Sequence, residues 1–207
     1  MEVAFFFILP TAGFWRKMET NGRGFWCGTG GVNNFLYIMP KEKFIITFAG
    51  PVGCSKTPVA YYLSWKLGLP ILNNDAMRTE TVEDLGKFDE KEYLKRRDER
   101  IDELLKKGSS FIYDASIDRV WKDWKDRLLG KYEVFMISFD LSKGFIMELY
   151  AAKKYDESIR DVDKFIADHD KFLEEFADKV NLQITDENFK DRLRLSYEAA
   201  ERWMRYN

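Results

Sequence analysis

The chain has 207 residues, of which 45% are hydrophobic and 33% are charged. That length and hydrophobic content suit one domain with a substantial core and appendages, not two full domains. The formal net charge is −2, from 33 basic and 35 acidic residues, which excludes a global positive field that would recruit nucleic acid or an anionic membrane. Any anion-binding site must therefore be local.

Residues 1–40 are rich in glycine and aromatic side chains and show neither a helical nor a strand period. We expect a poorly ordered appendage, or an upstream extension if the natural start is Met39. The apolar run 3–9 lacks a preceding basic residue, which makes it a poor signal peptide, although that alternative stays open. Gly22 and Gly24 lack the third glycine of a dinucleotide fingerprint and follow no predicted strand, which excludes that motif.

The cysteines and the apolar runs bear on the compartment. Cys27 and Cys54 are the only cysteines, they match no zinc-binding spacing, and so few thiols indicate no secreted disulfide scaffold. No apolar run approaches the roughly 20 residues that a transmembrane helix requires. We therefore expect a protein of the reducing cytoplasm that has no membrane partner.

From about residue 41 onward, strands alternate with helices, which is typical of a parallel sheet covered on both faces. The first strand is a continuous apolar run that ends at Gly50, as expected of a buried central strand. Strands are expected at 44–49, 70–74, 110–114, 132–139 and 180–184. Helices are expected at 59–67, 83–107, 118–129, 142–154, 162–176 and 189–203. Residues 41–207 are therefore predicted to form one α/β domain of three layers, a five-stranded parallel sheet with helices on both faces.

Two conspicuous side-chain types fit the core of this domain better than a site. Trp121, Trp124 and Leu128 recur at spacings of three and four, which predicts one packed helical face. His169 is the only histidine and lies on the apolar stripe of the helix at 162–176. One histidine without a partner motif favours a packed side chain over a catalytic one.

The junction of the first strand and the first helix carries a phosphate-loop motif, G-x-x-x-x-G-K-[ST]. Small residues let successive backbone N–H groups turn around phosphate oxygens, and the following helix adds its positive N-terminal end. Lys56 is expected to reach the β- and γ-phosphates of a nucleotide, and the Thr57 hydroxyl to bind Mg²⁺. The alternative is a glycine turn that contains lysine and threonine by chance. The predicted nucleotide-binding residues are Gly50, Pro51, Val52, Gly53, Cys54, Ser55, Lys56 and Thr57.

Ser55 is a departure from this motif, because it stands where the motif has its second glycine. A β-carbon at this position is expected to crowd the loop and weaken phosphate binding. Pro58 falls in the first helical turn, where its missing N–H matters least.

With these residues in view, the segment 44–140 resembles the small P-loop kinases of the polynucleotide kinase, zeta toxin and chloramphenicol phosphotransferase group. The resemblance rests on the phosphate loop, on Asp75-Ala76-Met77-Arg78 after the second strand, and on Asp114 after the third. It implies a P-loop NTPase fold and catalytic roles for Lys56, Asp75 and Arg78. Asp75 would be the base for an acceptor hydroxyl, Arg78 would place acceptor or phosphate, and Asp114 would join Thr57 at Mg²⁺.

The resemblance also implies a lid over the transferring phosphate, at about 150–176. The candidate lid residues are Lys153, Lys154 and Arg160, with ordinary surface charge as the alternative for all three. A lysine neutralises charge but cannot hold two oxygens in a fixed fork, so this lid is poor in arginine.

The residues after Asp114 favour transfer over hydrolysis. Hydrolytic P-loop proteins place a glutamate directly after the aspartate of this strand, whereas this chain reads Asp114-Ala115-Ser116. The chain also lacks the N/T-K-x-D guanine element, which favours ATP over GTP. We therefore expect a kinase that uses ATP and Mg²⁺ and acts on an unidentified hydroxyl of a small molecule or a nucleic-acid end. The alternatives are a nucleotide-binding regulator or adaptor without transfer and, for Asp114, a structural turn residue.

Overall fold

The computed structural model describes residues 15–20, 23–28, 43–128 and 131–206. The chain divides into two compact units, Met1–Met39 and Pro40–Asn207. In the first unit, β1 (Trp15–Thr20) and β2 (Arg23–Gly28) pair as antiparallel strands, where the sequence period predicted no strand. The two residues between them are Asn-Gly, the strongest short hairpin signal, and that signal outweighs the missing alternation. The predicted disorder of the rest of residues 1–40 lies outside the described residues.

The second unit is built on a five-stranded parallel sheet in the order β4-β5-β3-β6-β7. β3 (Phe44–Ala49) is its central strand, and all six of its residues are buried, as the unbroken apolar run predicts. The buried Thr47 hydroxyl donates to the Tyr113 carbonyl at 3.3 Å, so the one polar side chain of this strand is satisfied. The other strands are β4 (Ile71–Asn73), β5 (Phe111–Ser116), β6 (Glu133–Phe139) and β7 (Leu182–Ile184).

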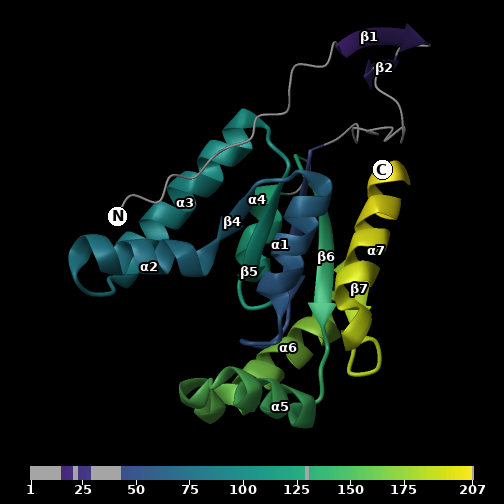
Figure 1. Ribbon diagram of the computed structural model, residues 1–207. Coiled ribbons are helices and arrows are strands. Elements are labelled where there is room, and N and C mark those ends of the chain that lie inside the picture. Colours follow the sequence, from purple (N-terminus) through teal and green to yellow (C-terminus); the bar gives the residue numbers. More distant parts are fainter. Residues whose placement is uncertain (1–14, 21–22, 29–42, 129–130, 207) are drawn as a thin grey trace, which may run out of the picture. The chain divides into compact units, whose positions relative to one another are not determined.

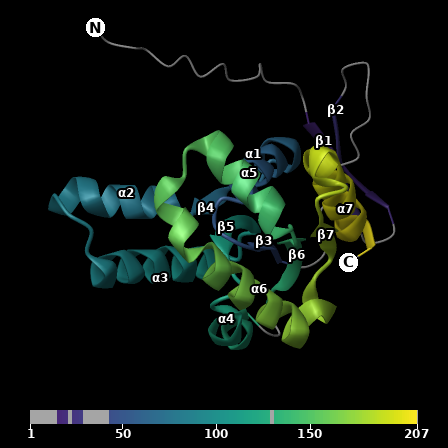
Figure 2. The ribbon, with the colours of Figure 1, turned by 90° about the horizontal axis from the view of Figure 1, so that it is seen from below.

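Two hydrophobic clusters cover the two faces of this sheet, because successive residues of a strand point to opposite sides. On one face, Phe44, Ile46 and Phe48 pack with α1 (Lys56–Leu67), α5 (Lys143–Lys153) and α7 (Arg192–Tyr206). On the other, Ile45 and Ala49 pack with α3 (Glu90–Lys107), α4 (Trp121–Leu128) and α6 (Val162–Phe176). The predicted three-layer α/β fold is confirmed, and Figure 2 shows the helices on either side of the sheet.

The tryptophans of α4 lie in the second cluster, as their spacing predicts. Trp121 and Trp124 are buried, and Trp124 stacks on Tyr113 of β5 with ring centroids 4.6 Å apart. Short 3₁₀ turns complete the chain at η1 (Asp156–Asp161), η2 (Ala177–Lys179) and η3 (Phe189–Asp191). Across the described residues, no helix has the length and apolar character needed to cross a bilayer.

The predicted single helix at 83–107 is wrong. The chain forms α2 (Asn74–Leu85), then breaks at Gly86, whose φ of 71° ends that helix in the left-handed conformation. α3 then begins at Glu90, and its N-cap is Asp89, whose carboxylate accepts a hydrogen bond from the Glu92 N–H at 2.9 Å. A glycine followed three residues later by an N-capping aspartate is the stop and start signal that the charge pattern concealed.

The carboxyl ends of the strands all lie at one edge of the sheet. In Figure 1 the arrowhead of β6 points toward this edge, where α5 and α6 lie. Because β4, β5 and β3 are neighbours in the sheet, the segments that come after them are brought together at that edge. Open α/β folds bind their ligands there.

Candidate active site

The phosphate loop, residues 50–57, connects β3 to α1 and contains two glycines that its shape requires. Gly50 and Gly53 have φ angles of 130° and 75°, values that residues with a β-carbon rarely adopt. A β-carbon on Gly53 would lie 2.6 Å from the Tyr150 ring, while the Tyr150 hydroxyl donates to the Val52 carbonyl at 2.7 Å. α5 therefore packs directly against the loop and holds its first turn.

Ser55 has the left-handed conformation, with φ 77° and ψ 27°, at the position where the motif has its second glycine. A residue with a β-carbon adopts this conformation at a cost of about 1–2 kcal/mol. Its side chain is 6% exposed, and its hydroxyl accepts a hydrogen bond from the Arg192 guanidinium at 3.2 Å. The loop thus keeps a backbone conformation that glycine favours, and Ser55 is strained in it. Arg192 of α7 binds the Ser55 hydroxyl in this conformation.

Lys56 lies inside the loop. Its ammonium donates to the carbonyl oxygens of Gly50 at 2.9 Å and Pro51 at 2.5 Å, and to the Cys54 sulfur at 3.3 Å. Burial raises the pKa of the Cys54 thiol, although the Lys56 charge opposes that shift. Cys54 is therefore a packed thiol at neutral pH, and Lys56 is the cation of the loop.

Thr57 and Asp114, the predicted metal-binding pair, line the same cavity. Burial raises the pKa of Asp114, and the charge of Asp75 adds to this, whereas the hydrogen bond from Thr57 lowers it. Asn73 also donates to the Asp114 carboxylate, at 2.6 Å. In the described part of the chain, no three His, Cys, Asp or Glu side chains gather as a metal site. One hydroxyl and one carboxylate fit Mg²⁺, which completes its shell with water and substrate phosphates.

Asp118 and His169 form a buried pair behind the loop that the sequence did not predict. The Asp118 carboxylate accepts from the Gly50 N–H at 3.1 Å and lies 3.2 Å from His169 Nδ1, and both side chains are 3% exposed. His169 Nε2 lies 3.2 Å from the Ser138 hydroxyl. An ionised carboxylate only accepts, so Nδ1 carries the proton and, in the neutral ring, Nε2 accepts from Ser138. His169 is thus packed, as predicted, and it also orients the aspartate that holds the loop.

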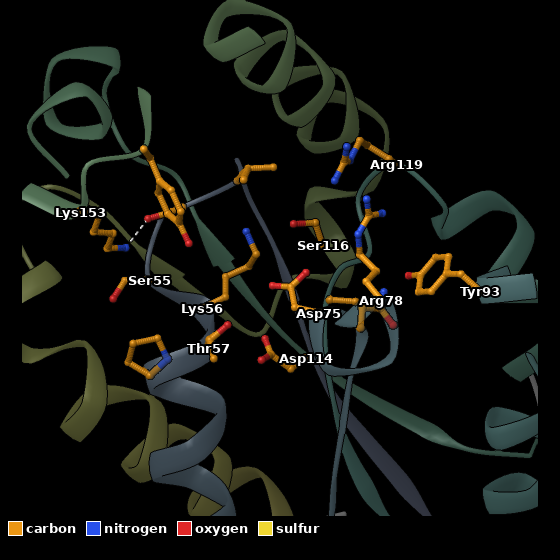
Figure 3. Close-up of a pocket in the computed structure, with 16 residues that line it drawn as sticks. Ser55, Lys56, Thr57, Asp75, Arg78, Tyr93, Asp114, Ser116, Arg119 and Lys153 are labelled. Atoms are coloured by element: carbon orange, nitrogen blue, oxygen red, sulfur yellow. Dashed lines mark hydrogen bonds between the residues drawn. The ribbon is translucent and has the colours of Figure 1, made fainter. Parts of the chain in front are cut away.

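Asp75 and Arg78 lie on α2 and line the same cavity as the phosphate loop, with Asp75 between Lys56 and Arg78 in Figure 3. The N-cap of α2 is Asn73, whose side chain accepts from the Ala76 N–H at 2.8 Å. Asp75 is therefore not the cap of this helix, and its carboxylate is exposed to the cavity. The same Asn73 side chain binds Asp114, so one amide links the start of α2 to the metal-binding pair.

The structure brings one of the three candidate lid residues to the site. Lys153 lines the cavity and donates to the Gly53 carbonyl at 2.5 Å. Burial, together with the charges of Arg192 and Lys56, lowers the pKa of Lys153. Lys154 ends α5 in the left-handed conformation and Arg160 lies on η1, and neither lines the cavity.

A cavity of about 400 Å³ joins these groups, within the range typical of small-ligand sites. Figure 3 shows Lys56, Thr57 and Asp114 between Ser55 and Lys153 on one side and Arg78 and Tyr93 on the other. Sequence reasoning missed Asn74, Tyr93, Ser116, Arg119 and Tyr155, which also line the cavity. The only available signal was the position of Ser116 and Arg119 shortly after Asp114, at the end of a predicted strand.

Comparisons with known proteins show the fold. No protein-family model matches the chain, and no curated protein matches it. A Chloroflexus aurantiacus protein described provisionally as a kinase is 14% identical with a TM-score of 0.51, covering 77% of this chain and 99% of that one. The Mycobacterium tuberculosis APS kinase is 17% identical, with 78% and 99% covered and a TM-score of 0.49. A Bacteroides thetaiotaomicron shikimate kinase is 11% identical, with 78% and 98% covered and a TM-score of 0.48.

The chain shares its α/β fold with the Chloroflexus aurantiacus protein. At these identities the likeness concerns fold alone, and it does not establish the polynucleotide kinase, zeta toxin and chloramphenicol phosphotransferase group that the sequence resembles. The loop at 50–57 lies at the strand-to-helix junction that the motif predicts.

Asp118 provides a test of how the loop is held. In Asp118→Ala, the Gly50 N–H and the His169 ring lose a buried partner, which costs about 1–3 kcal/mol for each unsatisfied group. We expect a lower melting temperature and weaker nucleotide binding, with partial recovery in Asp118→Asn, whose amide oxygen still accepts from Gly50. Asp123→Ala, at an exposed position of α4, is the matched control. Equal nucleotide affinity in Asp118→Ala and Asp123→Ala would contradict a role for this pair in holding the loop.

Asp114 provides a test of the metal-binding pair. Because burial raises its folded pKa above the unfolded value of about 3.9, the folded protein binds this proton more tightly than the unfolded chain. The stability that this raised pKa provides at acid pH is lost as pH rises toward and through the folded pKa, so at pH 7 the buried carboxyl destabilises the ligand-free fold. Asp114→Asn should therefore raise the melting temperature of the ligand-free protein at pH 7, by about 2–4 °C per kcal/mol recovered. It should also abolish the Mg²⁺ dependence of nucleotide binding. A lower melting temperature with unchanged Mg²⁺ dependence would make Asp114 a structural residue.

Proposed function

We propose that this protein is a kinase that transfers the γ-phosphate of Mg-ATP to a hydroxyl of a bound acceptor. One observation carries the proposal: a single cavity brings together the phosphate loop with Lys56, the Thr57–Asp114 pair, and the exposed carboxylate of Asp75. These are a phosphate cradle, a magnesium site and a base, which are the parts that phosphoryl transfer to an alcohol requires.

The loop side of the cavity suits the donor nucleotide. The loop precedes the N-terminus of α1, so backbone N–H groups and the positive end of the helix are available to phosphate oxygens. Lys56 would exchange its contacts with loop carbonyls for phosphate oxygens, and Thr57 and Asp114 would hold Mg²⁺. When bound, Mg-ATP supplies the phosphoryl group and the divalent charge that offsets its negative oxygens.

Asp75 suits the role of base because its carboxylate faces the cavity and makes no cap. During transfer, the acceptor oxygen bonds to the γ-phosphorus while the bond from phosphorus to the bridging oxygen of ADP breaks. The acceptor proton passes to the Asp75 carboxylate, which also orients the attacking oxygen. Arg78, three residues further along α2, supplies donors and charge to the acceptor or the phosphate.

The two residues after Asp114 favour transfer over hydrolysis. Ala115 is nearly buried and carries no carboxylate, and Ser116 donates its hydroxyl to the Gly50 carbonyl at 3.0 Å. Asp75 and Asp114 are the only carboxylates among the residues that line the cavity. With Asp114 committed to the metal, Asp75 is the remaining base, and it lies where an acceptor can bind.

The Asp75-Ala76-Met77-Arg78 element at the start of α2 supports the finer assignment to the polynucleotide kinase, zeta toxin and chloramphenicol phosphotransferase group. In that group the aspartate of this element acts on the acceptor hydroxyl. The exposed position of Asp75 in the cavity is consistent with that role.

A nucleotide-binding regulator without transfer is the second candidate, and the conformation of Ser55 favours it. A strained serine with a bound Arg192 stands in a loop that normally has glycine, and the lid brings a lysine but no arginine of its own to the cavity. A screen of sugars, nucleosides and 5′-hydroxyl ends separates the two functions. Tight Mg-ATP binding with no transfer to any of these acceptors would support the regulator.

Asp75→Asn tests the proposed reaction. The substitution keeps the size of the side chain and removes its basicity, so transfer to any accepted hydroxyl should fall by roughly 10²- to 10⁴-fold. ATP affinity should barely change, since among the described residues the Asp75 carboxylate makes no hydrogen bond or ion pair with the loop. Glu83→Gln, an exposed carboxylate of the same helix outside the cavity, is the matched control and should transfer normally. An Asp75→Asn protein that melts earlier but transfers at the normal rate would leave the proposed reaction without its base.

A further inference from the structure

Arg78 and Arg119 line the half of the cavity that lies away from the phosphate loop. Arg78 comes from α2, and Arg119 from the segment between β5 and α4. Figure 3 shows their guanidinium groups near each other, on the side of Asp75 that lies away from Lys56 and Lys153. Two positive charges in one wall of a cavity repel each other, and an anion bound between them offsets that repulsion.

Neither guanidinium has a carboxylate within ion-pairing distance among the described residues. The arginines nearby differ in this respect. Arg96 of α3 pairs with Asp84 and Arg100 pairs with Glu80, across the α2–α3 helix pair. Carboxylates are thus available in this region. They form ion pairs with Arg96 and Arg100 outside the cavity, but among the described residues none pairs with Arg78.

Aromatic side chains hold the two guanidinium groups by their faces. The Arg78 guanidinium carbon lies 4.2 Å from the Phe88 ring centroid and 5.5 Å from that of Tyr93. That of Arg119 lies 5.6 Å from the Phe165 ring centroid. Stacking occupies the face of a guanidinium and leaves its in-plane N–H donors free. These donors match the two oxygens of a carboxylate or phosphate.

The residues that line the cavity carry a net positive charge, which also suits an anionic ligand. The chain as a whole carries −2, whereas four basic and two acidic residues line the cavity. Lys56 and Lys153 donate to loop carbonyls and belong to the nucleotide side. Arg78 and Arg119 therefore leave the acceptor side positive even in the presence of Asp75.

We propose that the acceptor is a hydroxyl compound that also carries an anionic oxygen group, a carboxylate or a phosphate ester, which binds between Arg78 and Arg119. This inference rests on the proposed function and names the substrate class of the same site. The anionic group is anchored by the two guanidiniums, and the hydroxyl is presented to Asp75. A neutral acceptor would leave the two guanidinium charges without a counter-charge.

The test is a calorimetric titration of the full chain, saturated with Mg²⁺ and the non-hydrolysable ATP analogue AMP-PNP, which occupies the phosphate loop. Inorganic phosphate is the tetrahedral probe and acetate is the planar one, so the two titrations distinguish a phosphate ester from a carboxylate. We expect at least one of them to bind the wild type. Arg78→Gln and Arg119→Gln should each weaken that binding about 10-fold or more, as expected for a lost charge-assisted hydrogen bond. Arg100→Gln, outside the cavity and paired with Glu80, should leave it unchanged.

Absence of binding of both anions to the nucleotide-saturated wild type would overturn the inference, as would wild-type anion affinity in both Arg78→Gln and Arg119→Gln. The proposed function is judged separately, from the AMP-PNP titration that precedes the anions. If nucleotide binds but no arginine-dependent anion binding is found, the proposed kinase function stands and the proposed anionic acceptor is rejected. If the anion binds in an arginine-dependent way but nucleotide does not bind, the anion site stands and the proposed kinase function is rejected.

Discussion

The peptide group of Gly50 is the point on which the geometry of the site depends. The chain leaves the central strand here and must turn sharply, so the N–H and C=O of this residue cannot pair within the sheet. The N–H is bound by Asp118, and the carbonyl accepts from Ser116 and Lys56. A buried peptide group left without such partners would cost about 1–3 kcal/mol for each atom. The phosphate loop is therefore fixed by residues at and after the end of β5, and through His169 by α6.

The order of the strands in the sheet determines on which side of the Gly50 peptide group the other cavity residues lie. β5 lies beside β3 on one side, and β4 lies beyond it, so Asp114 and the start of α2 come to the same side of the loop. β6 lies on the other side, and the helices after β6 and β7 bring Lys153 and Arg192 to the loop. The two sides of the cavity, which the proposed function assigns to donor and acceptor, thus result from sheet topology. The same topology explains why residues from five separate segments act on one cavity.

Several features of the fold and the site could be predicted from the sequence because they depend on local patterns. The strand at 44–49, the loop at 50–57 and the position of Asp114 each derive from an apolar run or a motif with fixed spacing. The break at Gly86 was missed because the charged residues on either side of it read as one continuous helical surface. The hairpin at 15–28 was missed because its strands do not alternate, although Asn-Gly stands between them.

The contacts of His169, Arg119 and Arg192 could not be predicted, because each depends on a long-range arrangement of elements. His169 has the ordinary sequence position of a core residue on an apolar helical stripe, and only the packing of α6 places it against Asp118. Ser55 was identified as a departure from the motif, but its left-handed backbone and its bond to Arg192 depend on how α7 packs. The contacts of His169 and Arg192 join residues 51 and 137 positions apart, beyond the reach of any periodicity.

The central claim is that the loop at 50–57 binds the phosphates of Mg-ATP through Lys56. Its most direct test is calorimetric titration of Mg-ATP into the wild type and into Lys56→Ala, with melting temperatures of both ligand-free proteins as a check on folding. The expected result is saturable binding to the wild type and none to Lys56→Ala. The ligand-free fold should stay intact, because Ser116 still donates to the Gly50 carbonyl when Lys56 is removed. Equal binding of Mg-ATP by the two proteins would contradict the claim.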